Sequence, residues 1–158
     1  MSSSDGIRYS TITKYDIAGQ PTEAAVLFLE NGDMVAVIRR DGNPSTGMIG
    51  RAAPPYSDWQ LTEMKVRIGG QALCLLPNGT IIMGTREYDP PVKTVVGTVS
   101  LDGTFTRHFI VPSGGDTSYP GFVLEGDTLW MSYYSSHEGK SAIYMARIRI
   151  DSPREDAE

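Results

Sequence analysis

The sequence has 158 residues, of which 40% are hydrophobic and 21% are charged, and its formal net charge is −5. This composition is typical of one globular domain and, with no cluster of Lys and Arg, argues against nucleic acid and anionic membrane surfaces as partners. No apolar stretch reaches the ~18 residues of a membrane span, and the opening MSSSDG predicts no signal peptide, so the compartment stays open.

Short apolar runs separated by turn signals predict an all-β protein. In chain order, polar disordered tails are expected at 1–6 and 151–158, with a strand at 7–17 after the first tail. A first unit, about 20–67, is expected to hold strands at 24–30, 33–40, 46–52 and 60–67. A second unit, about 68–114, is expected to hold strands at 71–76, 80–88, 93–101 and 104–111. A third unit, 115–150, shows only three strands, at 120–125, 128–135 and 141–150.

Three hairpin turns repeat at equal spacing. Gly32, Gly79 and Gly126 lie 47 residues apart (79 − 32 and 126 − 79), each between two apolar runs. A period in the forties with several strands per unit is typical of a β-propeller blade. The sequence therefore predicts three blades of four antiparallel strands in a single half-propeller domain.

Three blades cannot close a ring, since propellers need at least four. Two copies of the chain would make a six-bladed propeller, so we expect a homodimer in which strand 7–17 of one copy completes the third blade of the other. Two alternatives remain at this stage: a half excised from a longer chain, or a monomeric sandwich or barrel.

Polar side chains recur seven residues after each turn glycine, as Arg39, Arg86 and Tyr133. A hairpin folds the end of its second strand back to the start of its first, which places Glu23 beside Arg39 and residues 117–119 beside Tyr133. A propeller brings such positions to one mouth of its central channel. Planar arginine side chains suit a carboxylate or sulfate, so the pattern predicts a site for a glycan or a small anionic sugar. Each residue alone also fits an ordinary strand-end ion pair or packed aromatic.

The segment EAAVLFLENGDMVAVIR resembles one in the sialidase superfamily of six-bladed propellers, in which a Glu begins a strand, an Asp/Asn-Gly turn follows and an Arg ends the next strand. Residues 115–150 resemble the blade that carries the sialidase tyrosine. The resemblance implies that Tyr119 is the nucleophile and Glu23 its base, an exception to carboxylate nucleophiles. It also implies that Arg39 grips the sugar carboxylate, with Arg86 a weaker candidate for the same role.

The family's early arginine motif and acid/base aspartate have no counterpart in this sequence, so the resemblance covers only the second half of such a propeller. Asp116 is the candidate acid, or else an Asx-turn residue. His137 lies on an expected turn where it either touches a sugar or has only a turn role. Neither a metal nor a cofactor is expected, and Cys74 is expected to be a buried thiol. The function predicted is exo-glycoside hydrolysis, with a non-catalytic carbohydrate-binding or scaffold propeller as the alternative.

Overall fold

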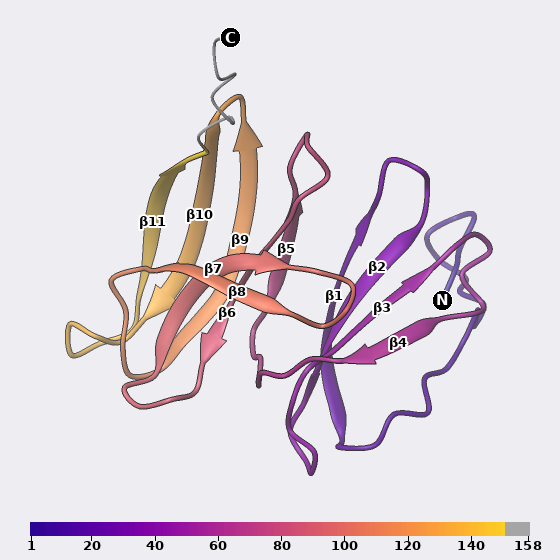
Figure 1. Ribbon diagram of the computed structural model, residues 1–158, viewed down its shortest axis with the longest axis horizontal. Coiled ribbons are helices and arrows are strands. Elements are labelled where there is room, and N and C mark those ends of the chain that lie inside the picture. The colour runs from indigo at the N-terminus through magenta and orange to yellow at the C-terminus, as the bar shows by residue number, and fades with distance from the viewer. Residues whose placement is uncertain (151–158) are drawn as a thin grey trace, which may run out of the picture.

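The computed structural model describes residues 1–150, which form three antiparallel sheets and no helix (Figure 1). The first sheet has the order β1 (Pro21–Phe28), β2 (Met34–Arg40), β3 (Met48–Ala52) and β4 (Gln60–Glu63). The second has the order β5 (Ala72–Leu75), β6 (Ile81–Glu87), β7 (Lys93–Val99) and β8 (Phe105–Ile110). The third contains β9 (Thr117–Glu125), β10 (Thr128–Ser135) and β11 (Ala142–Arg149), with β10 in the middle.

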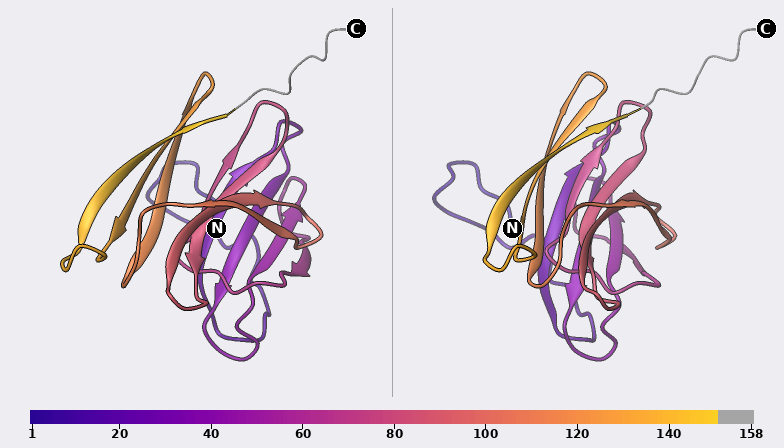
Figure 2. Two further views of the ribbon diagram at one scale, coloured as in Figure 1. Left: turned by 60° about the vertical axis from the view of Figure 1, so that its left-hand side comes forward. Right: turned by 90° about the vertical axis from the view of Figure 1, so that its left-hand side faces the viewer.

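Each sheet is a meander that starts from an inner strand. The inner strands β1, β5 and β9 lie side by side, with β5 in contact with both of the others. From there the sheets fan outward, and Figure 2 shows the third sheet as a separate layer beside the other two. This arrangement is consistent with consecutive propeller blades, and it confirms the predicted all-β fold with three antiparallel sheets.

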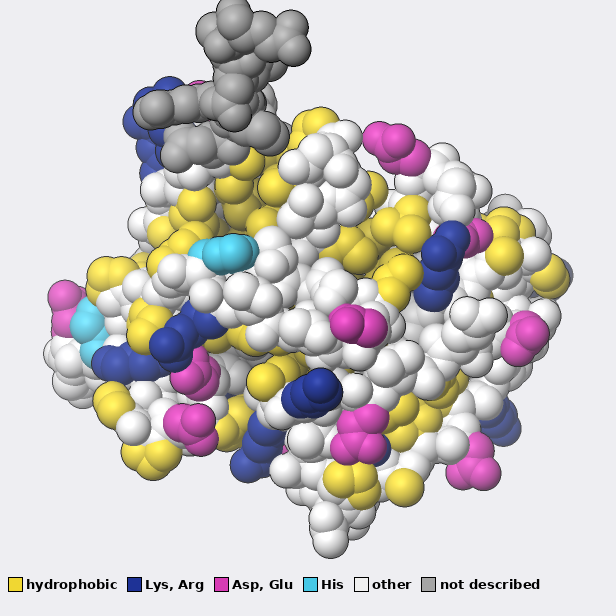
Figure 3. Space-filling view, viewed as in Figure 1, with side chains coloured by type: hydrophobic (Ala, Val, Ile, Leu, Met, Phe, Trp, Pro, Cys, Tyr) yellow, Lys and Arg dark blue, Asp and Glu magenta, His cyan; other side chains and the backbone are white. Residues whose placement is uncertain are grey.

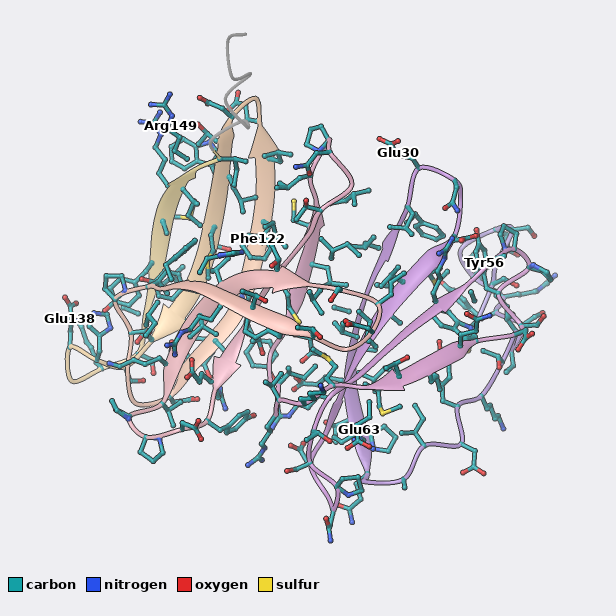
Figure 4. The ribbon with its side chains drawn as sticks, viewed as in Figure 1. Glu30, Tyr56, Glu63, Phe122, Glu138 and Arg149 are labelled. Atoms are coloured by element: carbon teal, nitrogen blue, oxygen red, sulfur yellow. The ribbon has the colours of Figure 1, made fainter. Side chains whose placement is uncertain are left out.

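Two hydrophobic cores fill the spaces between the sheets. The first lies between sheets one and two, and the second between sheets two and three. Ile82 and Met83 of β6 enter different cores because successive side chains of a strand point to opposite faces. The sheets approach so closely that a Cβ added at Gly84 would lie 2.7 Å from Cζ of Phe122, which is labelled between sheets two and three in Figure 4. Cys74 is only partly buried against the second core.

The three hairpin turns are not equal in length. In the first two, Leu29 bonds to Asp33 and Leu76 bonds to Thr80 across three-residue turns that contain Gly32 (φ +84°) and Gly79 (φ +82°). In the third, Glu125 pairs directly with Thr128, so only two residues make the turn. Six positions after the first paired residue that follows each turn, the chain has Arg39, Arg86 and then Tyr134. The equal glycine spacing therefore misplaces the third polar position by one residue.

Residues 7–17 form no strand in the structure, contrary to expectation; the only pairing in this part is an isolated bridge between Ser2 and Ser10. The Tyr15 ring of this segment packs edge-on against Trp59 of the β3–β4 connection, with centroids 5.3 Å apart. Of the two expected disordered tails, 1–6 has a described conformation and 151–158 lies outside the described residues. Within residues 1–150 no helix is long and apolar enough to cross a lipid bilayer.

Candidate functional site

The carboxylate of Glu23 is the meeting point of all three blades. It lies at the start of β1, where a bulge shifts the register between Pro21 and Glu23, and it faces Arg39 across the ladder. Oε1 accepts hydrogen bonds from Tyr119 Oη and, at 3.0 Å, from Arg39 Nη1, while Oε2 accepts one from the Gly70 backbone N–H at 3.1 Å. The donors come from the first, second and third blades, so the packing of the blades assembles this site.

Tyr119 owes its position to a break in β9. The register of β9 on β10 shifts at this point, and Tyr119 has a φ of +49°, which a non-glycine residue rarely adopts. The preceding residue, Ser118, is buried and its hydroxyl donates to Gly69 O at 2.7 Å. Ser118 thus fixes the bulge to the second blade and leaves the Tyr119 side chain 54% exposed above Glu23. Such backbone strain is typical of functional positions.

The hydrogen bond between Tyr119 and Glu23 moves both pKa values. Burial would raise the pKa of Glu23, but the bonds from Tyr119, Gly70 and Arg39 outweigh it and lower the pKa below its ordinary value. The same bond to Glu23, with some burial, raises the pKa of Tyr119, while Arg39 and Arg86 act in the opposite direction. In the resting site the carboxylate is therefore ionised and the phenol keeps its proton.

A second group with the same three functional groups, a carboxylate, a guanidinium and a phenol, lies beside the first. Arg86 Nη2 donates to Asp116 Oδ1 at 3.0 Å and to Tyr134 Oη at 2.8 Å, and Tyr134 Oη donates to the same Asp116 oxygen at 2.5 Å. Burial first, and then the bond to Asp116, raises the pKa of Tyr134 to about 12. The rings of Tyr119 and Tyr134 stack with centroids 6.0 Å apart, so the two groups form one continuous surface.

The structure brings together five of the seven residues that the sequence predicted for the site: Glu23, Arg39, Arg86, Asp116 and Tyr119. Tyr133 lies elsewhere, since it is buried in the second core and its hydroxyl donates to Pro112 O at 2.9 Å. His137 makes no hydrogen bond to these five side chains within residues 1–150; its ring lies 4.8 Å from that of Tyr144, and its Nδ1 lies 2.9 Å from Ser135 Oγ.

Tyr134 occupies the position predicted for Tyr133, because the third turn is one residue shorter than the other two. The lengths of the three turns, rather than the spacing of their glycines, would have indicated Tyr134 as the site residue. Along the lower edge of the view in Figure 3, where β1 and β9 begin, basic and acidic side chains gather. Among residues 1–150 no three His, Cys, Asp or Glu side chains gather as metal ligands would.

No protein-family model matches this sequence, and no curated protein matches it. Solved structures do. A protein of unknown function from Dyadobacter fermentans superposes with a TM-score of 0.73 at 20% identity, over 83% of this chain and 38% of its own. An α-L-arabinanase from Penicillium chrysogenum, complexed with arabinobiose, has a TM-score of 0.68 at 15% identity, over 85% of this chain and 47% of its own.

A mutant of the α-L-arabinofuranosidase from Fusarium graminearum, in complex with an iminosugar inhibitor, has a TM-score of 0.68 at 14% identity, over 84% of this chain and 46% of its own. This chain thus spans less than half of the length of these structures. At such identities the likeness shows the fold alone. The three sheets of this chain have the β-propeller fold that is also found in glycoside hydrolases.

Proposed function

We propose that this chain carries the catalytic face of a propeller glycoside hydrolase that acts on an anionic sugar, with Tyr119 as nucleophile. The observation that carries the proposal is the hydrogen bond from Tyr119 to Glu23, held in place by Arg39. A neutral phenol can approach an anomeric carbon that bears a carboxylate, where an anionic Asp would be repelled. The likeness to propeller glycoside hydrolases supports the proposal at the level of the fold.

In the proposed reaction the Tyr119 oxygen attacks the anomeric carbon while its proton moves to Glu23. Because the pKa values of the two groups lie far apart in the resting site, this proton moves only as the new C–O bond forms. The glycosidic bond breaks, and the leaving oxygen takes a proton from Asp116. Water, activated by Asp116, then displaces Tyr119, and the proton returns from Glu23 to the phenol.

The two arginines keep hydrogen-bonding capacity for a sugar carboxylate. Arg39 uses Nε for Asp41 at 2.9 Å and Nη1 for Glu23 at 3.0 Å. Arg86 uses Nε for Thr117 O at 2.7 Å and Nη2 for Asp116 and Tyr134. Nη2 of Arg39 and Nη1 of Arg86 therefore have no hydrogen-bond partner in the described part of the chain. In the proposal these two groups bind the substrate carboxylate from neighbouring blades.

Hydrolysis of an aryl sialoside and of 4-nitrophenyl α-L-arabinofuranoside tests the proposal. We expect Tyr119→Phe to lower kcat by at least about 10²-fold and Tyr133→Phe, with its hydroxyl in the core, to leave kcat unchanged. Asp116→Asn should leave the first step on nitrophenyl substrates fast, because their leaving group needs no proton, but should slow the second step, so that nitrophenol appears as a burst. On methyl glycosides the same change should cost about 10²–10⁴-fold. Equal turnover by the parent and Tyr119→Phe contradicts Tyr119 as nucleophile, and no turnover by either contradicts hydrolysis.

Closure of the ring by a second copy of the chain is the part of the proposal that concerns assembly. The outer face of the third sheet exposes Val123 (65%), Ile143 (74%) and Met145 (65%), and β1 exposes Val26 (56%) and Phe28 (54%). In a ring of two copies, each of these faces would cover the other. Light scattering should then give twice the mass of the 17.2 kDa chain. A stable monomer at micromolar concentration would mean that no second copy covers these faces.

A non-catalytic glycan-binding propeller is the second candidate. It is favoured by one contact pattern: Arg86 and Tyr134 both donate hydrogen bonds to Asp116 Oδ1, so protein groups already engage the side chain that hydrolysis would need as its acid. This candidate predicts saturable glycan binding with no turnover of any aryl glycoside, and binding that survives Asp116→Asn.

A further inference from the structure

A cavity of about 450 Å³ opens between the first and second blades, next to the proposed catalytic residues. Its walls come from the connection between β4 and β5, the end of β6, and the outer strands β7 and β8; the lining includes Lys65, Arg67, Arg86, Tyr88, Phe105 and Arg107. The volume lies in the range typical of small-molecule sites. Arg86 belongs both to this cavity and to the group around Asp116, so the two sites share a wall.

The cavity carries an excess of positive charge. Four of the lining side chains are cationic and two, Glu87 and Asp89, are carboxylates. Glu87 forms an ion pair with Arg107, whose Nη1 donates to both carboxylate oxygens at 2.7 and 2.8 Å. Lys65 makes no ion pair with any carboxylate among residues 1–150, and Arg67 has only a long contact of 3.7 Å with Asp41. Lys65, Arg67 and the Nη1 group of Arg86 are therefore the cationic groups of the lining with capacity to bind an anion.

The cavity also has an aromatic and apolar side. The Arg67 guanidinium lies over the Tyr88 ring at 3.9 Å from its centroid, and that of Arg86 at 5.8 Å. Tyr88 can lie there only because residue 69 is Gly, since a Cβ at that position would be 2.2 Å from Tyr88 Oη. Stacking fixes the plane of Arg67 and leaves its N–H edge for hydrogen bonds. Phe105 adds an apolar wall against which the C–H face of a sugar ring can pack.

We propose that this cavity is a second subsite that binds an acidic sugar unit, with Lys65 and Arg67 contacting its carboxylate or sulfate group. That this acidic sugar is part of the hydrolase substrate rests on the proposed function. With a shared wall at Arg86, one oligosaccharide places its reacting unit over Tyr119 and a second charged unit in the cavity. The preferred ligand is then an oligosaccharide with at least two acidic units, rather than a single terminal acidic sugar on a neutral chain.

Binding of sodium glucuronate, measured by protein-detected NMR on the full chain, tests the subsite. We expect shifts at residues of the cavity, weaker binding as sodium chloride is raised, and much weaker binding of glucose. Lys65→Ala and Arg67→Gln should each weaken glucuronate binding about fivefold. Lys140→Ala, a matched loss of an exposed cation on the β10–β11 loop, should leave the affinity unchanged. Equal affinity of the parent, Lys65→Ala and Arg67→Gln would overturn the subsite.

Two further measurements are needed. One distinguishes binding of a sugar from binding of a simple anion, and the other distinguishes the subsite proposal from the hydrolase proposal. Inorganic sulfate should bind several-fold more weakly than glucuronate, because it lacks the sugar ring that packs on Phe105; equal affinities would overturn a sugar subsite. Tyr119→Phe should keep the glucuronate shifts in the cavity. If this chain hydrolyses no glycoside but glucuronate binds and responds to Lys65→Ala, the hydrolase proposal fails and the subsite stands. If this chain hydrolyses an aryl sialoside but glucuronate causes no NMR shifts in the cavity, the hydrolase proposal stands and the subsite proposal fails.

Discussion

The side chains of Glu23 and Tyr119 are hydrogen-bonded to each other although 96 positions separate them in the chain. Glu23 begins the inner strand of the first blade and Tyr119 lies near the start of the inner strand of the third. The Gly70 N–H, which lies between these two blades in sequence and in space, donates to the other oxygen of the same carboxylate at 3.1 Å. One contact thus spans the whole width of the three-bladed unit.

Replacing Tyr119 by Phe should raise the pKa of Glu23 towards its ordinary value, because the hydrogen bond from the phenol is one of the contacts that lower it. A carboxyl group whose pKa is lowered by folding adds to the free energy of unfolding at pH values above its unfolded pKa. This added stability is lost as pH falls through the folded pKa. Tyr119→Phe should therefore make stability less sensitive to acid below about pH 4.5. Carboxyl NMR titration measures the pKa directly, and an unchanged Glu23 midpoint would contradict the contact.

Gly70→Ala should be far more costly than Gly79→Ala. Both glycines have positive φ, +52° and +82°, but a Cβ at Gly70 would lie 2.8 Å from Ser118 Oγ, while one at Gly79 meets nothing within 4 Å. We expect urea unfolding to show losses of about 1 kcal/mol for Gly79→Ala and about 3 kcal/mol for Gly70→Ala. Gly70→Ala should also displace the N–H that binds Glu23. Equal losses would mean that the blades do not meet closely at Gly70.

Tyr133→Phe and Tyr134→Phe should have opposite consequences. The Tyr133 hydroxyl is part-buried and donates to Pro112 O, so its removal should lower the free energy of unfolding by about 1 kcal/mol with no effect on glycan binding or turnover. The Tyr134 hydroxyl links Arg86 to Asp116 at the exposed mouth, so its removal should alter binding with little change in stability. The reverse pattern would show that the third hairpin keeps the register of the first two.

Alkaline titration should reveal Tyr15 and Tyr134 as the latest to ionise of the eight tyrosines in the chain. The pKa values of Tyr15, through burial, and of Tyr134, through burial and Asp116, are raised to about 12. The unfolded chain loses these protons near pH 10, so the stability they contribute is complete below about pH 10 and falls as pH rises towards 12. Absorbance at long ultraviolet wavelength, read immediately after a pH jump, should show both late steps, and Tyr134→Phe should remove one. A single step near pH 10 for all eight would contradict this.

The blades could be predicted because their turns carry a local signal. Asn31-Gly32 and Asn78-Gly79 mark the same three-residue turn, and the residues that follow keep the same register in both blades. The third turn contains Gly126 at the expected spacing but pairs Glu125 directly with Thr128, and glycine spacing does not report turn length. The shift from Tyr133 to Tyr134 follows from that one residue.

Other parts of the site and fold could not be predicted because they depend on tertiary contacts. Arg67 and Tyr88 lie in the β4–β5 and β6–β7 connections, and they meet only because the first and second blades pack together. The segment 7–17 has a strand-like pattern, but pairing requires a free sheet edge as well as a pattern. In the structure Tyr15 packs on Trp59, which directly precedes β4, and residues 7–17 pair with none of the named strands.

The placement of Arg39 and Arg86 on adjacent blades has a thermodynamic consequence. An anion that bridges their remaining N–H groups would bind the packed blades and not the separated ones, so its binding energy would add to the resistance of the chain to heat. The melting temperature of the chain thereby becomes a general detector of ligands for this mouth. A thermal screen of acidic saccharides would rank them without a chromogenic substrate or any assumption about turnover.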